Sequence, residues 1–487
     1  MNFLTLLTHR RAIQRPTTLT PLTFTAFKAA ASLGLYPMAK AVTQSLPDAA
    51  RLVAITLLMA SVTGASAETD TPKPRKTGKQ LVVVHSAPVQ KLAAKASPKP
   101  AATPTARSAH AQPRTKNPKD GEAEARLIAI YKLIGQAKTR EALPQAESLV
   151  KDHPNFQLAQ LVYGDLLAAQ TRPVRTLGDV PDTTAKAGAP MLAELREESQ
   201  MRLKALRERP AAGLIPAQFQ VLSSANKHAI AVDASRARLY LFENTATGLK
   251  LIADYYLSVG KSGIEKAVEG DLRTPLGVYF ITSNLDPRTL KDFYGSGALP
   301  INYPNQLDTK RGKTGGGIWL HGTPSGQFSR APLATDGCLV LANPDLERII
   351  KTVAVRTTPV LIAPSLKWVA PQTARADGKS FEDALEGWHT AKSSGDINRL
   401  MSWYAPDFTS FGKTLSEWAP ALQMEVKQLA GRPVQLKDVS YLRWTDTADT
   451  MVVTFGELAQ GARTGRTKRQ YWSRQGAQWK IFFEGTI

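Results

Sequence analysis

The sequence predicts a multidomain protein in which a small helical segment precedes a mainly β domain and an α+β domain. The chain has 487 residues, which is too long for a single hydrophobic core. Apolar residues recur at helical spacing before residue 210 and again after residue 380. Between these regions they alternate with polar residues in short runs separated by glycines, which is typical of strands.

The first 67 residues predict a secretory signal. Arg51 precedes an apolar run at 52–62, and the small residues Ala65-Ser66-Ala67 follow it as a cleavage site. The run is too short to cross a bilayer as a mature helix. Met38 is a second candidate start codon, and a buried N-terminal helix is the alternative interpretation. We expect an exported protein whose mature chain begins near Glu68.

Residues 68–120 predict a disordered, basic tether rich in proline and alanine. This stretch contains eleven Lys or Arg and three Asp or Glu, and the excess of basic residues supplies much of the net charge of +21. Such a composition buries too little apolar surface to fold. We therefore expect no nucleic-acid partner, and membrane contact only through the signal region or the tether, which is either a spacer or an electrostatic anchor.

The cysteine count excludes whole classes of site. Cys338 is the single cysteine of the chain, so no intramolecular disulfide and no cysteine-rich metal site can form. His321 has no second histidine at HExxH spacing, which argues against a zinc hydrolase. We expect neither a metal nor a cofactor.

Residues 121–210 predict a helical segment that is weakly similar to a tetratricopeptide pair. Leu127, Ile130, Leu133 and Ile134 share one helical face, and three short helices fit before residue 170. A break at 172–190 precedes a charged helix at 191–209. One helix pair is too little for a peptide-binding repeat array, so we expect a cap or scaffold.

The middle of the chain, residues 226–364, predicts the β domain. "HAIAVDASRARLYLFEN" alternates around a polar turn, as a hairpin does, and "LIADYYLSVG", "TPLGVYFITSNL" and "PVLIA" continue the pattern. "GGGIWLHG" predicts a short strand ending at His321, which we expect to be exposed. Asn343-Pro344 predicts a helix start.

Residues 380–487 predict the α+β domain. Two amphipathic helices are separated at Ser394-Gly395-Asp396, where Asp396 is a candidate N-cap. "VQLKDVSYLRWTD", "TMVVTFGELAQG", "TKRQYWSRQG" and "QWKIFFEGTI" then predict an antiparallel meander.

Cys338 and His321 are the candidate nucleophile and base. A thiolate attacks carbonyl carbon, and an imidazole or a cation favours its formation. In "TDGC", Gly337 permits a tight turn that presents backbone amides to an oxyanion. From these residues alone a cysteine buried in a core remains the alternative.

The motif pair resembles the L,D-transpeptidase catalytic domain, the YkuD family. The resemblance rests on His321-Gly322-Thr323, on sixteen intervening residues before Cys338, on Thr335-Asp336-Gly337-Cys338, and on the preceding "TPLGVYFI" and "IAVDASRARLYLFEN". It covers roughly residues 226–364.

The resemblance implies an exported cysteine acyltransferase of the periplasm or cell envelope. Cys338 would attack the amide between the third and fourth residues of a peptidoglycan stem peptide, releasing D-alanine and leaving a thioester. His321 would act as base, and the Gly322 carbonyl would orient it. The Gly337 and Cys338 amides would form the oxyanion hole. The partners would be stem peptides and, as acceptor, a second stem or an envelope protein, and carbapenems would acylate the cysteine.

Two positions depart from the family pattern. Asp336 stands where the family has histidine, and Val340 where it commonly has Arg or Asn. A carboxylate beside the sulfur disfavours the thiolate unless a cation such as Arg330 or Lys313 compensates. Two alternatives stay open: an L,D-amidase whose thioester is resolved by water, and a catalytically silent peptidoglycan-binding protein.

The C-terminal domain resembles the SnoaL-like or nuclear transport factor 2-like cone fold. "ALEGWHTAKSSGDINRLMSWYAPDF" and "YWSRQGAQWKIFFEG" carry this resemblance. His389, Asp396 and Asp407 are candidates to line a pocket, although structural roles for the first two are the alternative. No acid–base pair stands out, so the resemblance implies a binding or dimerising accessory domain.

Overall fold

The structure is a computed structural model that describes residues 121–179, 188–429 and 431–487. All of the described residues belong to one compact unit. The predicted signal region and tether lie outside the described residues. Within the described ranges, no helix combines the length and the apolar character needed to cross a membrane.

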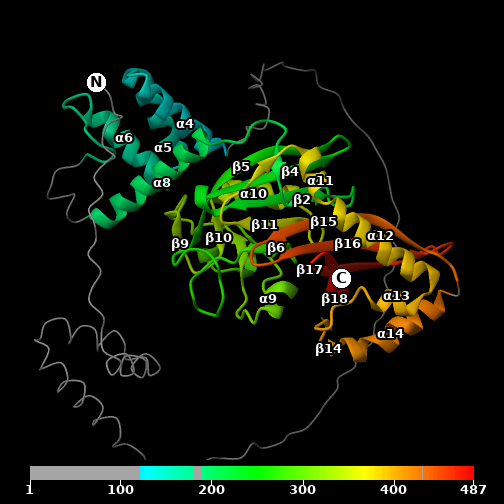
Figure 1. Cartoon of the computed structure of the whole chain (residues 1–487). Coiled ribbons are helices and arrows are strands. Elements are labelled where there is room, and N and C mark those ends of the chain that lie inside the picture. Colours follow the sequence, from blue (N-terminus) through cyan, green and yellow to red (C-terminus); the bar gives the residue numbers. More distant parts are fainter. Residues whose placement is uncertain (1–120, 180–187, 430) are drawn as a thin grey trace, which may run out of the picture. The chain divides into compact units, whose positions relative to one another are not determined.

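Four helices form the segment that precedes the β domain (Figure 1). They are α4 (Glu122–Gly135), α5 (Thr139–Asp152), α6 (Gln157–Ala168) and α8 (Ala189–Arg207). Leu127, Ile130, Leu149 and Val162 are among the fully buried residues of their common core. The predicted helices of this segment are confirmed.

The helical segment packs against the loop that leads to Cys338. Phe328 belongs to the same core and stacks on Phe156, with ring centroids 4.2 Å apart. The backbone N–H of Phe328 donates to the Asn155 carbonyl at 3.1 Å. The Ser329 hydroxyl donates to Glu198 on α8 at 2.7 Å. The helices therefore hold this loop in place.

The middle domain is a mixed sheet of nine strands, in the order β6-β11-β3-β4-β5-β10-β8-β7, with β9 pairing to β5. The strands are β3 (His228–Asp233), β4 (Arg238–Thr245), β5 (Gly248–Gly260), β6 (Gly277–Phe280), β7 (Ala298–Pro300), β8 (Trp319–His321), β9 (Leu333–Thr335), β10 (Leu339–Leu341) and β11 (Pro359–Ala363). Helical pieces between them are η1 (Ala234–Arg236), η2 (Pro287–Thr289), η3 (Asp292–Tyr294), α9 (Gln306–Lys310) and α10 (Asn343–Thr352). The mainly β prediction is confirmed.

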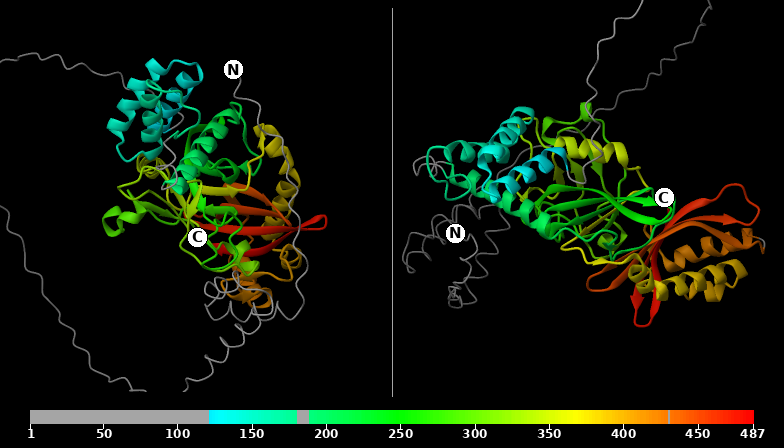
Figure 2. Two further views of the ribbon diagram at one scale, coloured as in Figure 1. Left: turned by 90° about the vertical axis from the view of Figure 1, so that its left-hand side faces the viewer. Right: turned by 90° about the horizontal axis from the view of Figure 1, so that it is seen from above.

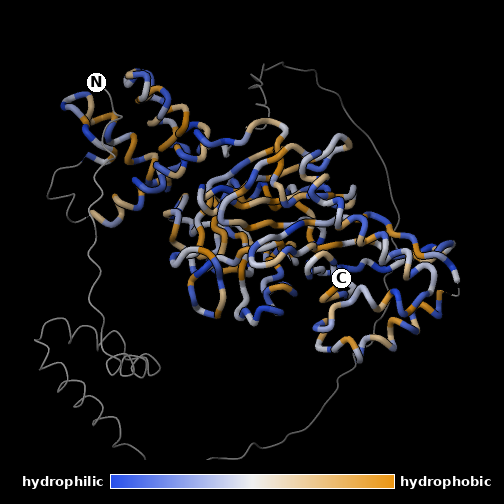
Figure 3. Tube along the Cα trace, viewed as in Figure 1, coloured by the Kyte–Doolittle hydropathy of each residue, from blue (hydrophilic) through white to orange (hydrophobic). Residues whose placement is uncertain are grey.

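Both faces of this sheet are buried, and its strands contain many apolar residues (Figure 3). Ile230, Val232 and Leu241 face the domain's own core. Their neighbours Ala231 and Phe242 face the opposite way, into a second core. Because side chains alternate along a strand, each strand can serve two cores at once.

The C-terminal domain places helices on one face of an antiparallel sheet (Figures 1 and 2). The helices are α11 (Pro371–Asp377), α12 (Lys379–Ser394), α13 (Ile397–Met401) and α14 (Leu415–Gln428), and the strands are β13 (Thr409–Ser410), β14 (Lys413–Thr414), β15 (Val434–Thr445), β16 (Asp449–Ala459), β17 (Arg466–Gln475) and β18 (Gln478–Thr486). The α+β prediction is confirmed, but α14 was not predicted. Its signal was present, because Thr414 and Glu417 form a capping box at its start.

Two short strands before the middle domain join it to the C-terminal part. β2 (Phe219–Val221) is the fifth strand of the C-terminal sheet, beside β15. β1 (Ile215–Pro216) pairs with β12 (Trp368–Val369). The second core described above is completed by C-terminal side chains such as Trp444, Tyr471 and Phe482. This face of the C-terminal sheet is therefore occupied within the chain and is not free for a second copy.

Buried charges connect the helical segment to the middle sheet. The Glu124 carboxylate of α4 accepts hydrogen bonds from Arg202 at 2.7 Å and from Arg238 at 2.7 and 2.8 Å. Arg202 also pairs with Glu198, and Arg238 with Asp254. All five side chains are buried. Burial would raise the pKa of Glu124, but Arg238 and Arg202 outweigh it and lower that pKa to about 2.

Removing Glu124 should destabilise the protein far more than removing its neighbour Glu122. Glu124→Ala leaves two buried guanidinium groups short of a counter-charge, which costs about 3 kcal/mol or more. Glu122 is the matched control, because it lies on the same helix in an exposed pair with Arg348 at 3.3 Å. Urea unfolding followed by circular dichroism measures both. Equal small losses for the two variants would contradict this account.

Candidate active site

The turn that carries Cys338 is held by two buried threonines. Thr335 Oγ1 accepts from the Gly337 N–H at 3.0 Å and donates to the Cys338 carbonyl at 2.7 Å. Thr274 Oγ1 donates to the Gly337 carbonyl at 2.9 Å. Gly337 has φ +122°, and a Cβ there would lie 2.7 Å from the Arg273 carbonyl oxygen. Only glycine satisfies both demands.

The register of two parallel strands puts Cys338 and His321 on one face. β10 pairs with β8 so that Leu339 lies opposite Leu320 and Val340 opposite His321. Leu339 and Leu320 point into the core. Side chains alternate, so Cys338, one residue before Leu339, and His321, one residue after Leu320, share the other face. With strands about 4.8 Å apart and a two-residue offset, their α-carbons are roughly 8 Å apart.

His321 is buried at 1% exposure, which corrects the prediction of an exposed strand end. Its Nδ1 lies 2.7 Å from the Gly322 carbonyl, so the contact that the resemblance implied is present. Because a carbonyl only accepts, Nδ1 carries the proton and Nε2 keeps its lone pair. The rings of Tyr294 and Phe293 pack around the imidazole, with centroids at 5.1 and 5.8 Å.

Asn343 fixes the backbone next to His321, a role that the sequence analysis missed. Its Oδ1 accepts from the Ser296 N–H at 2.9 Å, and its Nδ2 donates to the Thr323 carbonyl at 2.9 Å. A Cβ on Gly322 would lie 1.9 Å from Asn343 Oδ1. The sequence indicated only a helix start at this residue. Asn343 begins α10, and its side chain also holds the turn that orients the imidazole.

The imidazole is neutral at physiological pH. Burial, with a smaller effect of the nearby Arg330 cation, outweighs the opposing Gly322 hydrogen bond and lowers the pKa of His321 to about 4. An uncharged imidazole with a free Nε2 is the form that accepts a proton.

The thiol of Cys338 is also uncharged in the resting site. It is half-buried, and its Sγ donates to the Gly317 carbonyl at 3.5 Å. Burial raises the pKa of Cys338, and Asp336 raises it further, while the Trp319 amide, Arg330 and Lys266 lower it. Among the hydrogen bonds of the described residues, none joins Cys338 to His321.

Asp336 is an exposed residue paired with a cation that sequence reasoning did not select. Its carboxylate lies 2.9 Å from Lys261 Nζ. Of the two cations proposed to compensate it, Arg330 interacts electrostatically with both Asp336 and Cys338. Lys313 does not serve this purpose, because it pairs with Asp308 at 2.9 Å.

The two expected oxyanion donors differ in this state. The Gly337 N–H is already bonded to Thr335 Oγ1, so a substrate oxygen must compete with the hydroxyl for it. A hydroxyl that moves by rotation about one bond can release an amide without moving the backbone. The Cys338 amide lies immediately before β10, in the same residue as the candidate nucleophilic sulfur.

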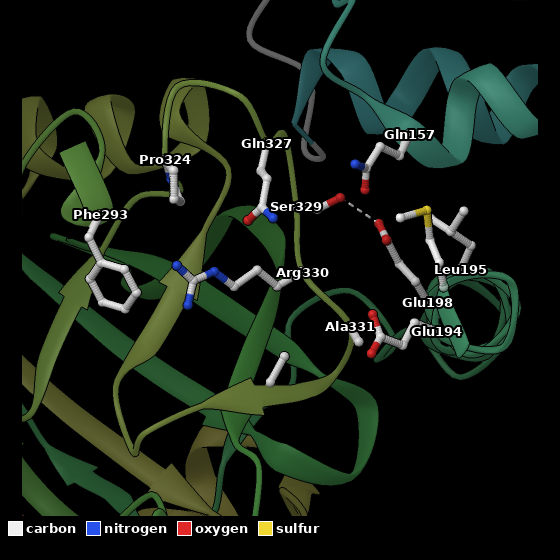
Figure 4. Close-up of a pocket in the computed structure, with 12 residues that line it drawn as sticks. Gln157, Glu194, Leu195, Glu198, Phe293, Pro324, Gln327, Ser329, Arg330 and Ala331 are labelled. Carbon is white, nitrogen blue, oxygen red and sulfur yellow. Dashed lines mark hydrogen bonds between the residues drawn. The ribbon is translucent and has the colours of Figure 1, made fainter. Parts of the chain in front are cut away.

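A cavity of about 430 Å³ lies beside the site, between the helical segment and the loop before Cys338 (Figure 4). Phe293 and Arg330, which border it, are the same residues that face His321 and Cys338. Its wall is a mixture of apolar and polar side chains: Gln157, Met191, Glu194, Leu195, Glu198, Phe293, Pro324, Gln327, Ser329, Arg330, Ala331 and Ala334.

The three candidate pocket residues of the C-terminal domain have separate structural contacts. His389 Nε2 contacts the Val434 carbonyl at 2.7 Å, Asp396 caps α13, and Asp407 pairs with Lys310 of the middle domain. Ion pairs join the helices to the sheet in a network formed by Lys392 of α12, Glu425 of α14, and Glu457, Lys468 and Glu484 of the sheet. Within the described ranges, no group of three His, Cys, Asp or Glu side chains could hold a metal ion.

Comparison with known families agrees with both resemblances. Residues 227–362 match the YkuD model, the L,D-transpeptidase catalytic domain, and residues 380–485 match the Cds6 C-terminal NTF2-like domain. The two predicted families are therefore confirmed. The middle of the chain is thereby assigned a peptidoglycan-related function of the L,D-transpeptidase type, and this family acts on stem peptides.

Three solved structures are similar to parts of the chain. Bd1075 of Bdellovibrio bacteriovorus is 24% identical with a TM-score of 0.48, covering 56% of this chain and 98% of its own. The helical cell shape determining protein Pgp2 of Campylobacter jejuni is 21% identical with a TM-score of 0.44, covering 59% and 99%. An L,D-transpeptidase from Mycobacterium smegmatis is 12% identical with a TM-score of 0.19, covering 28% and 58%. No curated protein matches the chain.

Replacing Asp336 should lower the pKa of the Cys338 thiol. Asp336→Asn removes a negative charge that opposes the thiolate, so the thiolate should form at lower pH. The pH dependence of iodoacetamide labelling, followed by intact mass, reports this directly because Cys338 is the single cysteine. The exposed Asp286→Asn is the control. A midpoint that rises or stays unchanged in Asp336→Asn would refute the electrostatic account.

Proposed function

We propose that this protein is a cysteine acyltransferase that acts on peptidoglycan stem peptides through a thioester. The observation that carries the proposal is the register that places Cys338 and His321 on one face of the sheet, with His321 Nδ1 held by Gly322. A nucleophile, a base with a free lone pair and a group that orients the base are the parts that covalent acyl transfer needs.

The first chemical step starts from neutral groups. Nε2 of His321 takes the thiol proton as Sγ of Cys338 attacks the amide carbon, so that an S–C bond forms and negative charge moves to the carbonyl oxygen. The thiol must first leave the Gly317 carbonyl for the imidazole. Such contacts commonly tighten only when substrate binds. The Cys338 amide, and the Gly337 amide once Thr335 releases it, would stabilise the oxyanion.

The second step breaks the C–N bond. His321, now protonated, gives its proton to the leaving amine and returns to its neutral form, which burial favours. An acceptor amine then attacks the thioester and frees the cysteine. Water in place of the amine would make the protein an L,D-amidase, so the products of the reaction decide between these two outcomes.

We further propose that the protein works outside the cytoplasmic membrane, in the periplasm or cell envelope. The support is the signal-like pattern ending at Ala65-Ser66-Ala67 and the basic stretch that follows it. The substrate class agrees with this location.

Intact-mass spectrometry of the mature protein tests the proposal. We expect a carbapenem to add to the wild type and not to Cys338→Ala. Tetrapeptide muropeptides should be converted to cross-linked dimers, or to shortened stems if water is the acceptor. His321→Gln should slow the reaction by about 10²- to 10⁴-fold. His389→Gln, in the C-terminal domain, is the matched control and should retain activity.

A folded wild type that gives no adduct and leaves muropeptides unchanged would rule out the enzyme. The catalytically silent, peptidoglycan-binding alternative would then stand.

The pH profile should reflect the low pKa of His321. Because burial disfavours the imidazolium, His321 loses its proton as pH rises through about 4, and kcat/KM should rise over the same range and be level by neutral pH. NMR titration of the imidazole of His321 gives the same value independently. A profile that instead rises near the ordinary histidine pKa of about 6.5 would contradict a buried base.

A further inference from the structure

Arg330 is a half-buried cation whose guanidinium forms no salt bridge within the described part of the chain. Among the described residues, no salt bridge or hydrogen bond of its guanidinium is found, and its contact is with the Phe293 ring, 4.7 Å from the guanidinium carbon. Burial lowers the pKa of Arg330, while Asp336 and Cys338 raise it. Removing an arginine from water without pairing it is unfavourable, so the position favours binding of an anion.

Arg330 is also the one cationic side chain that lines the cavity (Figure 4). The buried acid on the opposite wall, Glu198, is already engaged by Arg202 at 2.6 Å and by Ser329 at 2.7 Å. The cavity therefore offers a positive group at the end near the catalytic residues, between Phe293 and the loop strand.

The backbone of Arg330 is fixed from both sides. Its carbonyl accepts from the Tyr256 hydroxyl at 2.8 Å, and Ser329 beside it is bound to α8. Phe328 is stacked on Phe156 of the helical segment. Residues 121–210 thus have a definite task, which is to position the loop that carries the guanidinium.

The position of Arg330 across the Phe293 ring from His321 suits one group of the substrate. Phe293 lies against His321 on one side and Arg330 on the other. His321 gives its proton to the nitrogen of the leaving residue, and the α-carboxylate carbon of that residue is two bonds from this nitrogen. A free carboxylate on the leaving amino acid is therefore a substrate anion close to the imidazole, and Arg330 is the cation on the other side of the Phe293 ring.

We propose that Arg330 binds the free α-carboxylate of the leaving amino acid and so selects stem peptides that end at that residue. This inference rests on the proposed function. It also accounts for Val340, which is buried opposite His321 in the strand register at the position where the family commonly has Arg or Asn. Arg330 on the loop thus supplies a cation in place of the one that the strand lacks at Val340.

Binding to a Cys338→Ala background tests the proposal without turnover. Two probes are titrated calorimetrically: a tetrapeptide stem with a free C-terminal carboxylate, and the same peptide as a C-terminal carboxamide. We expect the acid to bind at least 10-fold more tightly than the amide. Adding Arg330→Gln should weaken binding of the acid by about 10- to 100-fold and leave the affinity for the amide unchanged, because only the acid forms charged hydrogen bonds with the guanidinium.

Two further variants separate recognition from folding. Arg330→Lys keeps the charge but not the planar fork, and should retain part of the preference for the acid. Arg463→Gln removes an exposed guanidinium in the turn between β16 and β17 and should change neither affinity. Equal affinities of the parent for acid and amide, or equal losses for both probes in Arg330→Gln, would overturn the proposal, as would a failure of the acid to bind.

Carbapenem adduct formation on wild-type Cys338 tests the acyltransferase activity independently of the proposed role of Arg330. An adduct together with equal handling of acid and amide would reject the role of Arg330 and leave the acyltransferase standing. Absence of both the adduct and peptide binding would reject the two together.

Discussion

The parallel pairing of β8 with β10 is the constraint on which the site depends. Leu320 and Leu339 are opposite each other and buried, so the strands cannot slip by one residue without turning core side chains to the other face. The same register places Cys338 and His321 together. Apolar packing on one face of the sheet thus determines the geometry of the candidate site on the other, and the turn hydrogen bonds of Thr335 and Asn343 refine it.

The other parts of the chain act through this sheet. The C-terminal domain covers the face that carries Ala231 and Phe242, and β2 makes the two domains structurally continuous. The helical segment is joined by the Glu124 network and holds the loop before Cys338. Neither neighbour is an appendage on a flexible linker: one buries the back of the sheet and the other shapes the approach to the site.

The local elements of this arrangement could be predicted from the sequence, but the contacts between distant segments could not. The longer strands and the helices α12 and α10 follow from spacing within short stretches, whereas the Cys338–His321–Gly322 set came from the resemblance of the motif pair to a known family. Lys261 and Thr274 reach the cysteine turn from more than sixty residues away, where no periodic signal connects them to it. β2 is three residues long and pairs with a strand more than two hundred residues later, so its membership of the C-terminal sheet had no signal either.

Burial of the site disfavours a preformed thiolate–imidazolium pair and favours a neutral thiol–imidazole pair. A thiolate–imidazolium pair would need charge in a site where desolvation raises the pKa of Cys338 and lowers that of His321. Both shifts favour a neutral resting pair, in which proton transfer accompanies attack, so that charge appears only in the intermediate, as the imidazolium of His321 and as the substrate oxyanion beside backbone amides. The Asp336 carboxylate then repels the resting sulfur little, because the thiol is uncharged. Lys261 also pairs with this carboxylate. The departure from the family pattern at this position is therefore compatible with an active site that begins and ends its cycle uncharged.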